Sequence, residues 1–498
     1  MDNPILWTLI SIQVVMGAFD TLVHHEGSER LAWRASQKTE LRLHGVRNFF
    51  YAVIFLCFAW LEPHGAFAIA LTLILAVEVM ITLWDFVEED MTRKLPGSER
   101  INHTLLALNY GAILALAAPY LLAWSSLPTG FVFVNYGWWS VMATLSAIGV
   151  GLFSARDLLA ASRSDRLKRG DPAELVAALP PRQHILVTGG TGFIGQRLVE
   201  ALVAAGHFVT VVTRNPKKAD MLSHPVRVIA DLDQVHNADH FDAIVNLAGE
   251  PIANGPWTRK KRAKIIQSRV DMTDGLNKLI QRLESKPKCL VNGSAIGWYG
   301  LRGNEELSEQ AGSTPAFVHD VCEAWERAAT QAIQYSVRIV RLRIGLVLGV
   351  DGGILAKLLT PFEFGGGCVM GDGQQWMSWI EQDDLVRVIA FAIANKAIEG
   401  PINATAPHPV RNVEFTNALA KVLKRPVFLK APHWILATLL GDMARETMLG
   451  GQRVVPSRLQ NYGFVFRHPR LAPMLRKITG AKPQQAGIDA HQQRIAAK

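Results

Sequence analysis

The sequence predicts an α/β fold with a doubly wound parallel sheet and a small C-terminal substrate portion, preceded by an all-α transmembrane bundle of about five helices. Three observations predict it. Long apolar stretches fill residues 4–160, a glycine-rich turn follows a short apolar run near residue 184, and strand-like and helix-like segments alternate after that turn. At 498 residues the chain is also longer than one domain of about 100–200 residues. We therefore expect a membrane half followed by a water-soluble half.

Five stretches of the first half are apolar and long enough to span a bilayer, which requires roughly 20 residues. They are residues 5–22, 44–61, 66–86, 103–124 and 132–153. The start of the chain, MDNPILW, lacks the basic residues of a cleavable signal peptide, and further apolar stretches follow. We therefore expect the first span to remain part of the protein.

Lysine and arginine collect in alternate loops, and this pattern sets the expected orientation because short cytoplasmic loops are enriched in them. The loops after the first and third spans and the segment after the fifth are basic, whereas the loops EPHG and SSLPTGF are not. We expect an integral protein of a bacterial inner membrane, with its N-terminus outside and its second half in the cytoplasm. The four cysteines form no CxxC pair, which fits a reducing cytoplasm. Because this topology explains much of the net charge of +9, the expected partner is the lipid bilayer and not nucleic acid.

Ionisable and polar residues recur at helical spacing within and beside the spans. Four sets share a helical face: Gln13 with Asp20 and His24, Glu78 with Asp85 and Glu89, Glu40 with His44, and Glu99 with His103. Carboxylates and imidazoles at such spacing are how helical bundles hold metal ions. One hypothesis is therefore a metal site, with His24, His44, Glu78 and His103 as candidate ligands.

The alternative is that these residues cap helix ends and form ion pairs with the basic loops. No ExxH pair occurs in the bundle, which argues against a di-iron centre of the usual kind. A haem held by two of the histidines stays open as a variant of the metal hypothesis.

A strand, a glycine turn and a helix are predicted in succession from residue 184. The run HILVT precedes GGTGFIG, and the amphipathic stretch QRLVEALVAAG follows. The turn satisfies both GxGxxG and GxxGxxG, and the residues expected to contact a pyrophosphate are Gly189, Gly190, Thr191, Gly192, Phe193, Ile194 and Gly195. This pattern predicts a Rossmann-type dinucleotide site.

The end of the next strand indicates which cofactor binds. NAD-specific sites usually carry an acid there, about 20 residues after the glycine turn. Here the residue is Arg214, Lys217 and Lys218 follow, and no acid precedes Asp220. A guanidinium suits the 2′-phosphate of NADP(H), so we expect NADP(H); the alternative is a solvated loop charge.

Two further segments complete the expected nucleotide site. Asp231, in VRVIADL, is placed to meet the adenine side of the cofactor. Leu247, Ala248 and Gly249, in DAIVNLAGEPI, form a small-residue turn that we expect to pass close to it.

Residues 184 to about 480 resemble the extended short-chain dehydrogenase/reductase superfamily, in its atypical epimerase-like branch related to sugar-nucleotide epimerases. The motifs that carry the resemblance are TGGTGFIG, NLAGEPI, WTRKKRAKIIQSRV, GSAIGWYG, RIGLVLGVDGGIL, SWIEQDDLVRVI, PINATAPHPVRNVEF and GQRVVPSRLQNYGF. The bundle lies outside the resemblance. We divide the chain into a transmembrane bundle (1–160), a polar linker (161–183), an NAD(P)-binding Rossmann domain (184–404), a C-terminal substrate-side domain (405–485) and a tail (486–498).

The resemblance implies hydride transfer at a nicotinamide, with a serine and the tyrosine of a YxxxK pair contacting the substrate. No tyrosine here has lysine four residues later, and the corresponding positions are Val318 and Cys322. Ser294 and Tyr299 are the remaining catalytic candidates, and for Tyr299 the alternative is a packed turn aromatic.

Several other polar residues are weaker candidates. They are Glu305 or Glu306 as a loop acid, Glu381 where the superfamily usually has histidine, Asp384 as a helix N-cap, and Asn412, Arg453 and Arg458 as contacts to an anionic substrate or as surface residues.

The leading interpretation is a membrane-anchored NADP-dependent oxidoreductase or epimerase-like protein that acts on an unidentified small molecule. A second interpretation is a non-catalytic NADPH-binding regulatory or assembly factor, favoured by the missing YxxxK. In a third, the spans are only a passive anchor.

Overall fold

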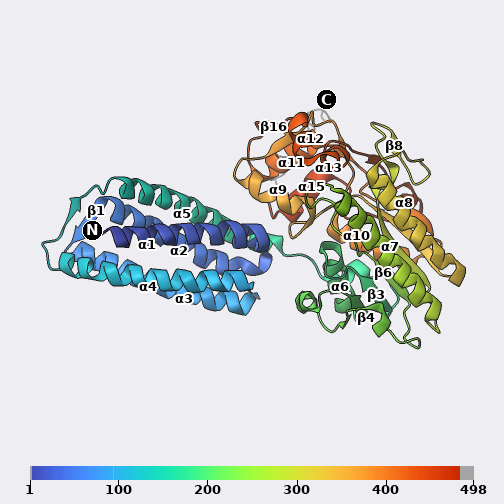
Figure 1. Ribbon diagram of the computed structural model, residues 1–498, viewed down its shortest axis with the longest axis horizontal. Helices are drawn as coiled ribbons and strands as arrows, with labels where there is room; N and C mark the ends of the chain where they lie inside the picture. The colour runs from blue at the N-terminus through green and yellow to red at the C-terminus, as the bar shows by residue number, and fades with distance from the viewer. Residues whose placement is uncertain (1–2, 94, 483–498) are drawn as a thin grey trace, which may run out of the picture. The chain divides into compact units, whose positions relative to one another are not determined.

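The computed structural model describes residues 3–93 and 95–482. The chain forms two compact units, Met1–Lys168 and Arg169–Lys498. The first unit is helical, and the second has the α/β fold that the sequence predicts (Figure 1). The expected tail, residues 486–498, lies outside the described residues.

Among the described residues, five long helices make up the first unit and run side by side (Figure 1). They are α1 (Pro4–Phe19), α2 (Lys38–Trp60), α3 (Ala66–Thr92), α4 (Gly97–Ser125) and α5 (Trp138–Arg163). By length and composition alone, five helical segments of this unit are able to cross a membrane. Their bounds differ from the predicted spans, because polar residues extend the beginnings of α2 and α4, and because α5 begins at Trp138 and not at residue 132.

The two ends of the bundle differ in polarity. At the end nearest the N-terminus, β1 (Leu61–His64) pairs antiparallel with β2 (Gly130–Phe133), where the sequence predicts two loops and the adjoining ends of two spans. Apolar side chains such as Trp7 and Phe58 form the core there. At the opposite end the buried side chains include Asp20, His24, His25, His44, Asp85, Glu89 and Glu99.

Helix α1 continues at this polar end as a π-helical segment, Asp20–Glu29. The N–H of Arg30, which ends the segment, donates to the carbonyl of His25 five residues earlier. Such turns are rare and bring residues five apart into line, whereas an α-helix aligns residues three and four apart. Both His24 and His25 are buried as a result.

Leucines cover the outer faces of the bundle. Leu73, Leu108, Leu122, Leu145 and Leu152 each expose more than 60% of their surface. Soluble proteins rarely expose so many large apolar side chains in one region. A surface of this composition is suited to lipid.

The second unit contains a seven-stranded sheet in the order β14-β9-β7-β6-β3-β4-β5, with every pairing parallel. Its strands are β3 (His184–Thr188), β4 (Phe208–Val212), β5 (Arg227–Ile229), β6 (Ala243–Asn246), β7 (Cys289–Ala295), β9 (Arg338–Ile344) and β14 (Gly400–Ala404). The chain runs outward from β3 to β5 and then returns to β6 on the other side of β3. This reversal is the switch point at which doubly wound sheets bind ligands.

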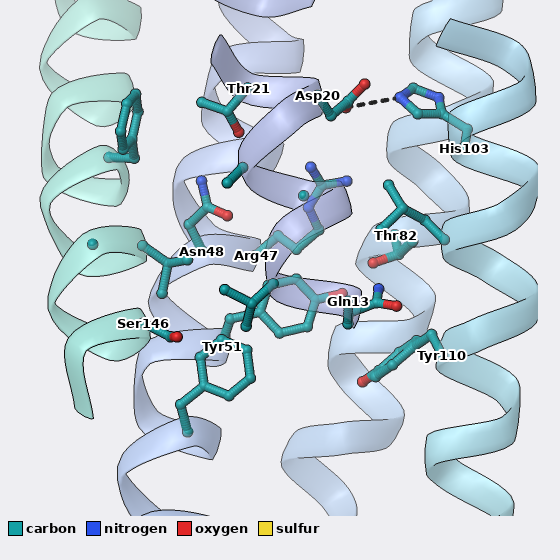
Figure 2. A pocket seen from close by; sticks show the side chains of 18 of the residues that line it. Gln13, Asp20, Thr21, Arg47, Asn48, Tyr51, Thr82, His103, Tyr110 and Ser146 are labelled. Carbon is teal, nitrogen blue, oxygen red and sulfur yellow. Dashed lines mark hydrogen bonds and ion pairs between the residues drawn. The ribbon is translucent and has the colours of Figure 1, made fainter. Parts of the chain in front are cut away.

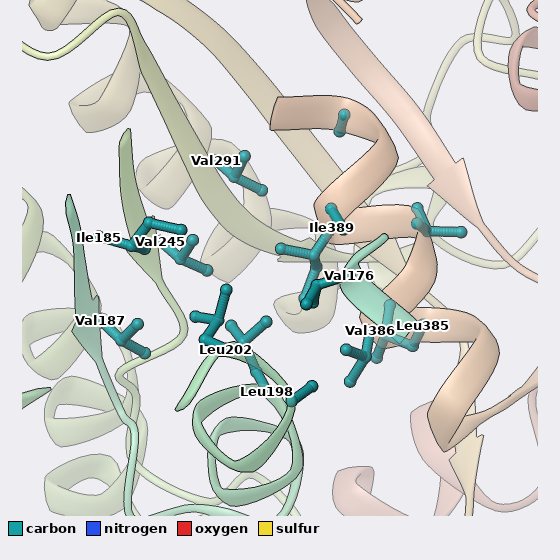
Figure 3. Packing of buried hydrophobic residues seen from close by; sticks show 14 of the residues in the cluster. Val176, Ile185, Val187, Leu198, Leu202, Val245, Val291, Leu385, Val386 and Ile389 are labelled. Carbon is teal, nitrogen blue, oxygen red and sulfur yellow. The ribbon is translucent and has the colours of Figure 1, made fainter. Parts of the chain in front are cut away.

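Helices cover both faces of this sheet. Helices α6 (Phe193–Ala204) and α10 (Gln382–Ala394) pack on one face, and α7 (Arg259–Arg282) and α8 (Phe317–Thr330) pack on the other. Successive strand side chains alternate between the faces. Figure 3 shows the first interface, where Leu198 and Leu202 of α6 and Leu385, Val386 and Ile389 of α10 meet Ile185, Val187, Val245 and Val291 of the strands.

The predicted linker, residues 161–183, is not all linker. Its first residues belong to α5. Farther on, Pro172–Val176 forms a 3-10 turn, and Val176 and Leu179 are buried in the core of the second unit (Figure 3). The segment from Pro172 to Leu179 is therefore part of the folded second unit.

The small C-terminal portion contains segments that come before β14 in the sequence and segments that come after it. It combines α9 (Gly353–Glu363), β11 (Cys368–Met370), β12 (Trp376–Met377), β15 (Val410–Arg411), α11 (Asn412–Leu423), β16 (Leu429–Ala431), α12 (His433–Leu440), α13 (Asp442–Thr447), α14 (Ser457–Asn461) and α15 (Leu471–Ile478). Short pairings complete it, with β10 (Leu346–Leu348) on β13 (Trp379–Glu381) and β8 (Glu306–Leu307) on β17 (Arg453–Val454). Because β11 pairs with β16 and β12 with β15, residues before 405 also belong to this portion.

Candidate functional site

The turn between β3 and α6 is built so that only glycine fits at two positions. Gly189 has a φ of +70°, and its carbonyl accepts a hydrogen bond from the N–H of Gly192 at 2.9 Å. A Cβ on Gly195 would lie 2.2 Å from that carbonyl oxygen and 2.7 Å from the Cα of Gly190. This close packing sets the glycine turn directly against the start of α6, and such turns at a helix N-terminus are where Rossmann sites bind a pyrophosphate.

The other residues of the turn join it to neighbouring elements. A Cβ on Gly190 would lie 2.7 Å from Val211 Cγ1 on β4. The carbonyl of Thr191 accepts a hydrogen bond from Gln196 Nε2 at 2.9 Å, and Ile194 packs against the core. Phe193 points toward the loop before α9, where a Cβ on Gly352 would lie 2.2 Å from its ring. Gly349, Gly352 and Gly353 of RIGLVLGVDGGIL therefore make room for Phe193.

The turn after β6 lies directly against the glycine turn. A Cβ on Gly189 would lie 2.7 Å from the carbonyl carbon of Leu247, and the N–H of Ala248 donates to Thr188 Oγ1 at 3.3 Å. Gly249 follows at the surface. The predicted contacts at Leu247, Ala248 and Gly249 are thus gathered with the glycine turn at the switch point of the sheet.

A buried amide network, which sequence reasoning missed, holds the strand ends at this point. Thr188 Oγ1 donates to Asn246 Oδ1 at 2.6 Å, and Asn246 Nδ2 donates to Asn292 Oδ1 at 2.7 Å and to Thr273 Oγ1 at 3.0 Å. Polar residues inside otherwise apolar strands were the signal that could have revealed it.

Arg214 lies exposed after β4, with Lys217 and Lys218 close behind in the chain. Within residues 3–93 and 95–482, Arg214 has no hydrogen bond or ion pair, so its guanidinium is free to bind an anion. Asp231 is also exposed, and its carboxylate accepts a hydrogen bond from the N–H of Asp233 at 3.0 Å. It therefore caps a local turn.

The two predicted catalytic hydroxyls belong to one buried network. Ser294 Oγ donates to Glu326 Oε1 at 2.8 Å, and Arg343 donates to both oxygens of Glu326 at 2.9 and 3.1 Å. On its other side Arg343 Nη1 donates to the Tyr299 hydroxyl at 3.2 Å, and that hydroxyl donates to Asn403 Oδ1 at 2.7 Å.

Burial dominates the chemistry of these groups. Tyr299 is 0% exposed and Ser294 is 3% exposed. Burial raises the pKa of the Tyr299 phenol, although the Arg343 guanidinium beside it acts in the opposite direction. The geometry agrees with the interpretation of Tyr299 as a packed turn aromatic, and its catalytic role stays a prediction.

Helix α8 carries Val318 and Cys322 where the superfamily has its YxxxK pair. Both side chains are buried, and Cys322 Sγ donates to the carbonyl of Ala295 at 3.6 Å. Burial raises the pKa of the Cys322 thiol to about 11, so the thiol keeps its proton near neutral pH.

Arg269 on α7 is a second cation at this edge, and the sequence analysis gave it no role. Its guanidinium donates to the carbonyls of Glu250 and Ile265 at 3.0 and 2.9 Å and lies 5.0 Å over the Trp325 ring. In the described part of the chain no carboxylate pairs with it. It lies beside Gly249, where a Cβ would approach the guanidinium carbon to 2.9 Å.

The N-cap of α10 is Glu381, whereas the sequence predicts Asp384. The Glu381 carboxylate accepts from the N–H of Asp384 at 2.9 Å, and burial together with Asp383 raises the Glu381 pKa to about 8. Asp384 instead accepts from the N–H groups of Arg467 and His468 at 3.0 and 2.8 Å, which ties the C-terminal segment to α10.

The remaining weaker candidates are engaged within the protein. Asn412 is buried and accepts from the N–H of Met370 at 3.0 Å, and Arg458 donates to the carbonyl of Pro401 at 2.8 Å. Glu305 forms an ion pair with Arg302, and Glu306 forms one with Arg453. The Arg453 guanidinium also lies over the Trp376 ring.

A second candidate site lies at the polar end of the bundle. Donor atoms of Asp20, His25, Glu99 and His103 all lie within 4.8 Å of one another, and so do those of His25, His44 and Glu89. We call these residues the donor cluster. Of the four predicted ligands, His44 and His103 belong to it.

The other two predicted ligands have different contacts. His24 Nδ1 lies 2.8 Å from Asp20 Oδ1 and its Nε2 lies 3.2 Å from Ser98 Oγ. Glu78 accepts from Thr82 Oγ1 at 2.6 Å and from the Tyr110 hydroxyl. His25 takes the predicted place of His24, because the π-helical turn aligns Asp20 with the residue five positions later.

A haem held between His25 and His44 does not fit, and a haem at another pair of the histidines stays a prediction. The rings of His25 and His44 stack at 4.5 Å between centroids, with 10° between their planes. A macrocycle has no room between rings in contact.

A cavity of about 260 Å³ adjoins the donor cluster, and side chains from all five helices line it (Figure 2). Its walls are mainly apolar, with Arg47, Asn48 and Tyr51 among the polar side chains. Asp20 and His103, whose carboxylate and imidazole lie 3.0 Å apart, stand at one end of it.

The glycine turn, the switch point and the parallel sheet together define a dinucleotide-binding protein of the Rossmann class. Residues 185–404 match the NAD dependent epimerase/dehydratase family, and residues 431–478 match a domain of unknown function, DUF1731. The chain is 40% identical over 301 residues to the epimerase family protein SDR39U1 homolog, chloroplastic, of Arabidopsis thaliana, which covers 59% of this chain and 86% of that protein. The chain therefore belongs to the epimerase family, through its second unit.

Two solved structures are similar to this chain. The crystal structure of human epimerase family protein SDR39U1 (isoform2) with NADPH has 30% sequence identity and a TM-score of 0.54, covering 59% of this chain and 99% of that one. The nucleoside-diphosphate sugar epimerase from Corynebacterium glutamicum has 28% identity and a TM-score of 0.50, covering 74% and 71%. These likenesses confirm the predicted Rossmann-type fold of the second unit.

Proposed function

We propose that the protein is an NADP(H)-binding, epimerase-like oxidoreductase whose nucleotide domain is anchored to a membrane by the bundle. The observation that carries the choice of cofactor is Arg214, an exposed guanidinium just after β4 that has no ion-pair partner among the described residues. A planar, permanently charged fork suits the 2′-phosphate that distinguishes NADP(H) from NAD(H). The NADPH in the similar human structure supports the same choice.

The residues that would hold the cofactor surround the switch point. The N–H groups of residues 189–195 would bind the pyrophosphate, Arg214 the 2′-phosphate, and the turn at Leu247–Gly249 would line the path between them. The cofactor would supply or accept a hydride. Arg269 lies at the same edge without a carboxylate partner among the described residues, so it favours a substrate that carries negative charge.

Substitution of Arg214 tests this assignment. Isothermal titration of the full chain in detergent should show NADPH binding weakened about 10-fold or more in Arg214→Ala, because a hydrogen bond to a charged group is worth about 1.5–3 kcal/mol. Arg327→Ala is the matched control, since it removes another exposed arginine from the same unit. An equal effect of both variants on NADPH, or an equal loss of NADH binding in Arg214→Ala, would contradict the assignment.

Membrane anchoring is supported by the five apolar helices and by the leucines on their outer faces. The orientation that fits the basic loops puts the N-terminus outside an inner membrane and the nucleotide domain in the cytoplasm. A tether of this kind raises the concentration of the domain near membrane-associated substrates.

The second candidate function is a non-catalytic, NADPH-binding regulatory or assembly factor. The observation that favours it is α8, where Val318 and a protonated, buried Cys322 occupy the places of the tyrosine and lysine. Purified protein distinguishes the two functions. An enzyme should oxidise NADPH with an accepted substrate and lose turnover on changes near the switch point, whereas a regulatory factor should bind NADPH in the same preparation without consuming it.

A further inference from the structure

Buried acidic side chains outnumber arginines at the polar end of the bundle. Five acids, each at most 5% exposed, are Asp20, Glu40, Asp85, Glu89 and Glu99. Two guanidinium groups form ion pairs with these acids. Arg47 pairs with Asp85, and Arg93 pairs with Glu40, Glu89 and Glu99 at 3.1, 3.6 and 2.7 Å. The five carboxylates therefore exceed the two guanidinium groups by three negative charges, and buried carboxylates need a compensating charge.

Two donor atoms within the cluster are buried and lack hydrogen bonds in the described part of the chain. His25 Nε2 lies 3.3 Å from Asp20 Oδ2 and 3.7 Å from Glu99 Oε1 without making a hydrogen bond to either. Glu89 Oε2 lies 3.3 Å from His103 Nδ1, also without a hydrogen bond. Unpartnered polar atoms are costly in a protein interior, so each needs an explanation.

We propose that the donor cluster binds at least one divalent transition-metal ion, with Asp20, His25, Glu99 and His103 as its primary ligands. Imidazole nitrogens combined with carboxylate oxygens suit iron, manganese or zinc. Ligands about 2.1 Å from an ion lie up to about 4.2 Å apart, so donors already within 4.8 Å need to move little. The two positive charges of one divalent ion would offset most of the excess of acids.

Surrounding contacts orient these ligands as outer residues of a metal site do. His24 Nδ1 lies 2.8 Å from Asp20 Oδ1, and Asn102 Nδ2 donates to the same oxygen at 3.1 Å. The other oxygen of Asp20, Oδ2, faces His25 and His103. Arg93 holds Glu99 through two hydrogen bonds of 2.7 and 2.9 Å.

The π-helical segment and the cavity both bear on this site. A π-helical turn is rare and is found often at functional sites, and here it is what brings His25 to Asp20. Asp20 and His103 also line the cavity of about 260 Å³, so an ion between them would face a mainly apolar chamber (Figure 2). The competing explanation is a metal-free network of ion pairs in which protonated histidines supply the missing charge.

Metal analysis of the full chain tests the proposal. The protein should carry no polyhistidine tag, be treated with EDTA, and then be dialysed against Mn²⁺, Fe²⁺ or Zn²⁺ before elemental analysis. We expect at least one tightly bound ion per chain, and an affinity at least 10-fold weaker in His25→Ala and His103→Ala. His64→Ala is the matched control, because His64 belongs to the same unit but lies in β1 at its other end.

Two further measurements keep the result independent of misfolding. Added Co²⁺ should produce visible ligand-field absorption in the unaltered chain, and metal should raise its Tm after EDTA treatment. NADPH binding measured on each sample separates failure of this proposal from failure of the proposed function. If the unaltered chain takes up no metal, or if His25→Ala and His103→Ala bind as much as His64→Ala, the cluster is an ion-pair network and the proposal is wrong.

Discussion

Arg343 and Glu326 form a buried bidentate ion pair, with hydrogen bonds of 2.9 and 3.1 Å, between β9 and α8. Ser294 binds the carboxylate side of the pair and Tyr299 binds the guanidinium side. The pair therefore links both hydroxyls that the sequence suggests for catalysis, and it leaves neither of them facing open solvent.

Neutralising this carboxylate should destabilise the nucleotide-binding unit. Glu326→Gln leaves a buried guanidinium without its charge partner, which costs about 3–5 kcal/mol and lowers Tm by roughly 6–20 °C. The measurement is thermal unfolding of the full chain, followed through loss of NADPH binding. Glu323→Gln, half-exposed on the same helix, is the control, and equal Tm values for the two variants would refute the structural role of the pair.

A methyl group at Gly195 should abolish or strongly weaken cofactor binding. Its Cβ would lie 2.2 Å from the Gly189 carbonyl oxygen, so the turn would have to open. We expect NADPH affinity to fall by about 10-fold or more, which corresponds to about 1.4 kcal/mol. Gly312→Ala is the control, because the nearest atom to its added Cβ would be 3.8 Å away. NADPH titration should separate the two variants clearly, and unchanged affinity in Gly195→Ala would argue that the turn does not hold the pyrophosphate.

The stability of the second unit should fall as the pH rises from about 4.5 toward 8. The pKa of Glu381 is raised from 4.5 to about 8 in the folded protein, so over that window the folded state keeps a proton that the unfolded state loses. Glu381→Gln mimics the protonated acid and should reduce the dependence. Tm measured at pH 5.5, 7 and 8.5 checks this, with the exposed Glu399→Gln as control. A Glu381→Gln variant as sensitive to pH as the control would contradict the expected burial.

The orientation of the bundle is testable with reporter fusions. Alkaline phosphatase fused after Ser126 should be active, because this loop is expected outside the membrane, whereas the same fusion after Arg34 should be inactive. Fluorescent-protein fusions at the two positions should give the reverse pattern. Phosphatase activity only at Arg34 would place the nucleotide domain on the outside and overturn the topology.

The sequence was most informative where short-range chemistry decides the structure. The glycine turn was predictable because Gly189 and Gly195 stand in conformations or contacts that a side chain cannot share, and the flanking strand and helix have clear periodicity. The doubly wound parallel sheet followed from the alternation of such segments.

The sequence was less informative where a residue's position depends on tertiary structure. A regular α-helix would align Asp20 with His24. The π-helical segment places His25 beside Asp20 in the donor cluster, and no pattern in the sequence predicts that segment. Likewise, Val176 looked like part of a linker because its neighbours are polar, although it packs into a core formed by segments distant in the chain. The partners of Ser294 and Tyr299, Glu326 and Arg343, come from two other elements, so spacing alone could not have paired them.

Titration of NADPH and NADH into the unaltered full chain in detergent tests the central claim most directly. The account predicts one NADPH per chain, bound at least about 10-fold more tightly than NADH because of the charge at Arg214. Tighter binding of NADH, or no binding of either nucleotide, would contradict it.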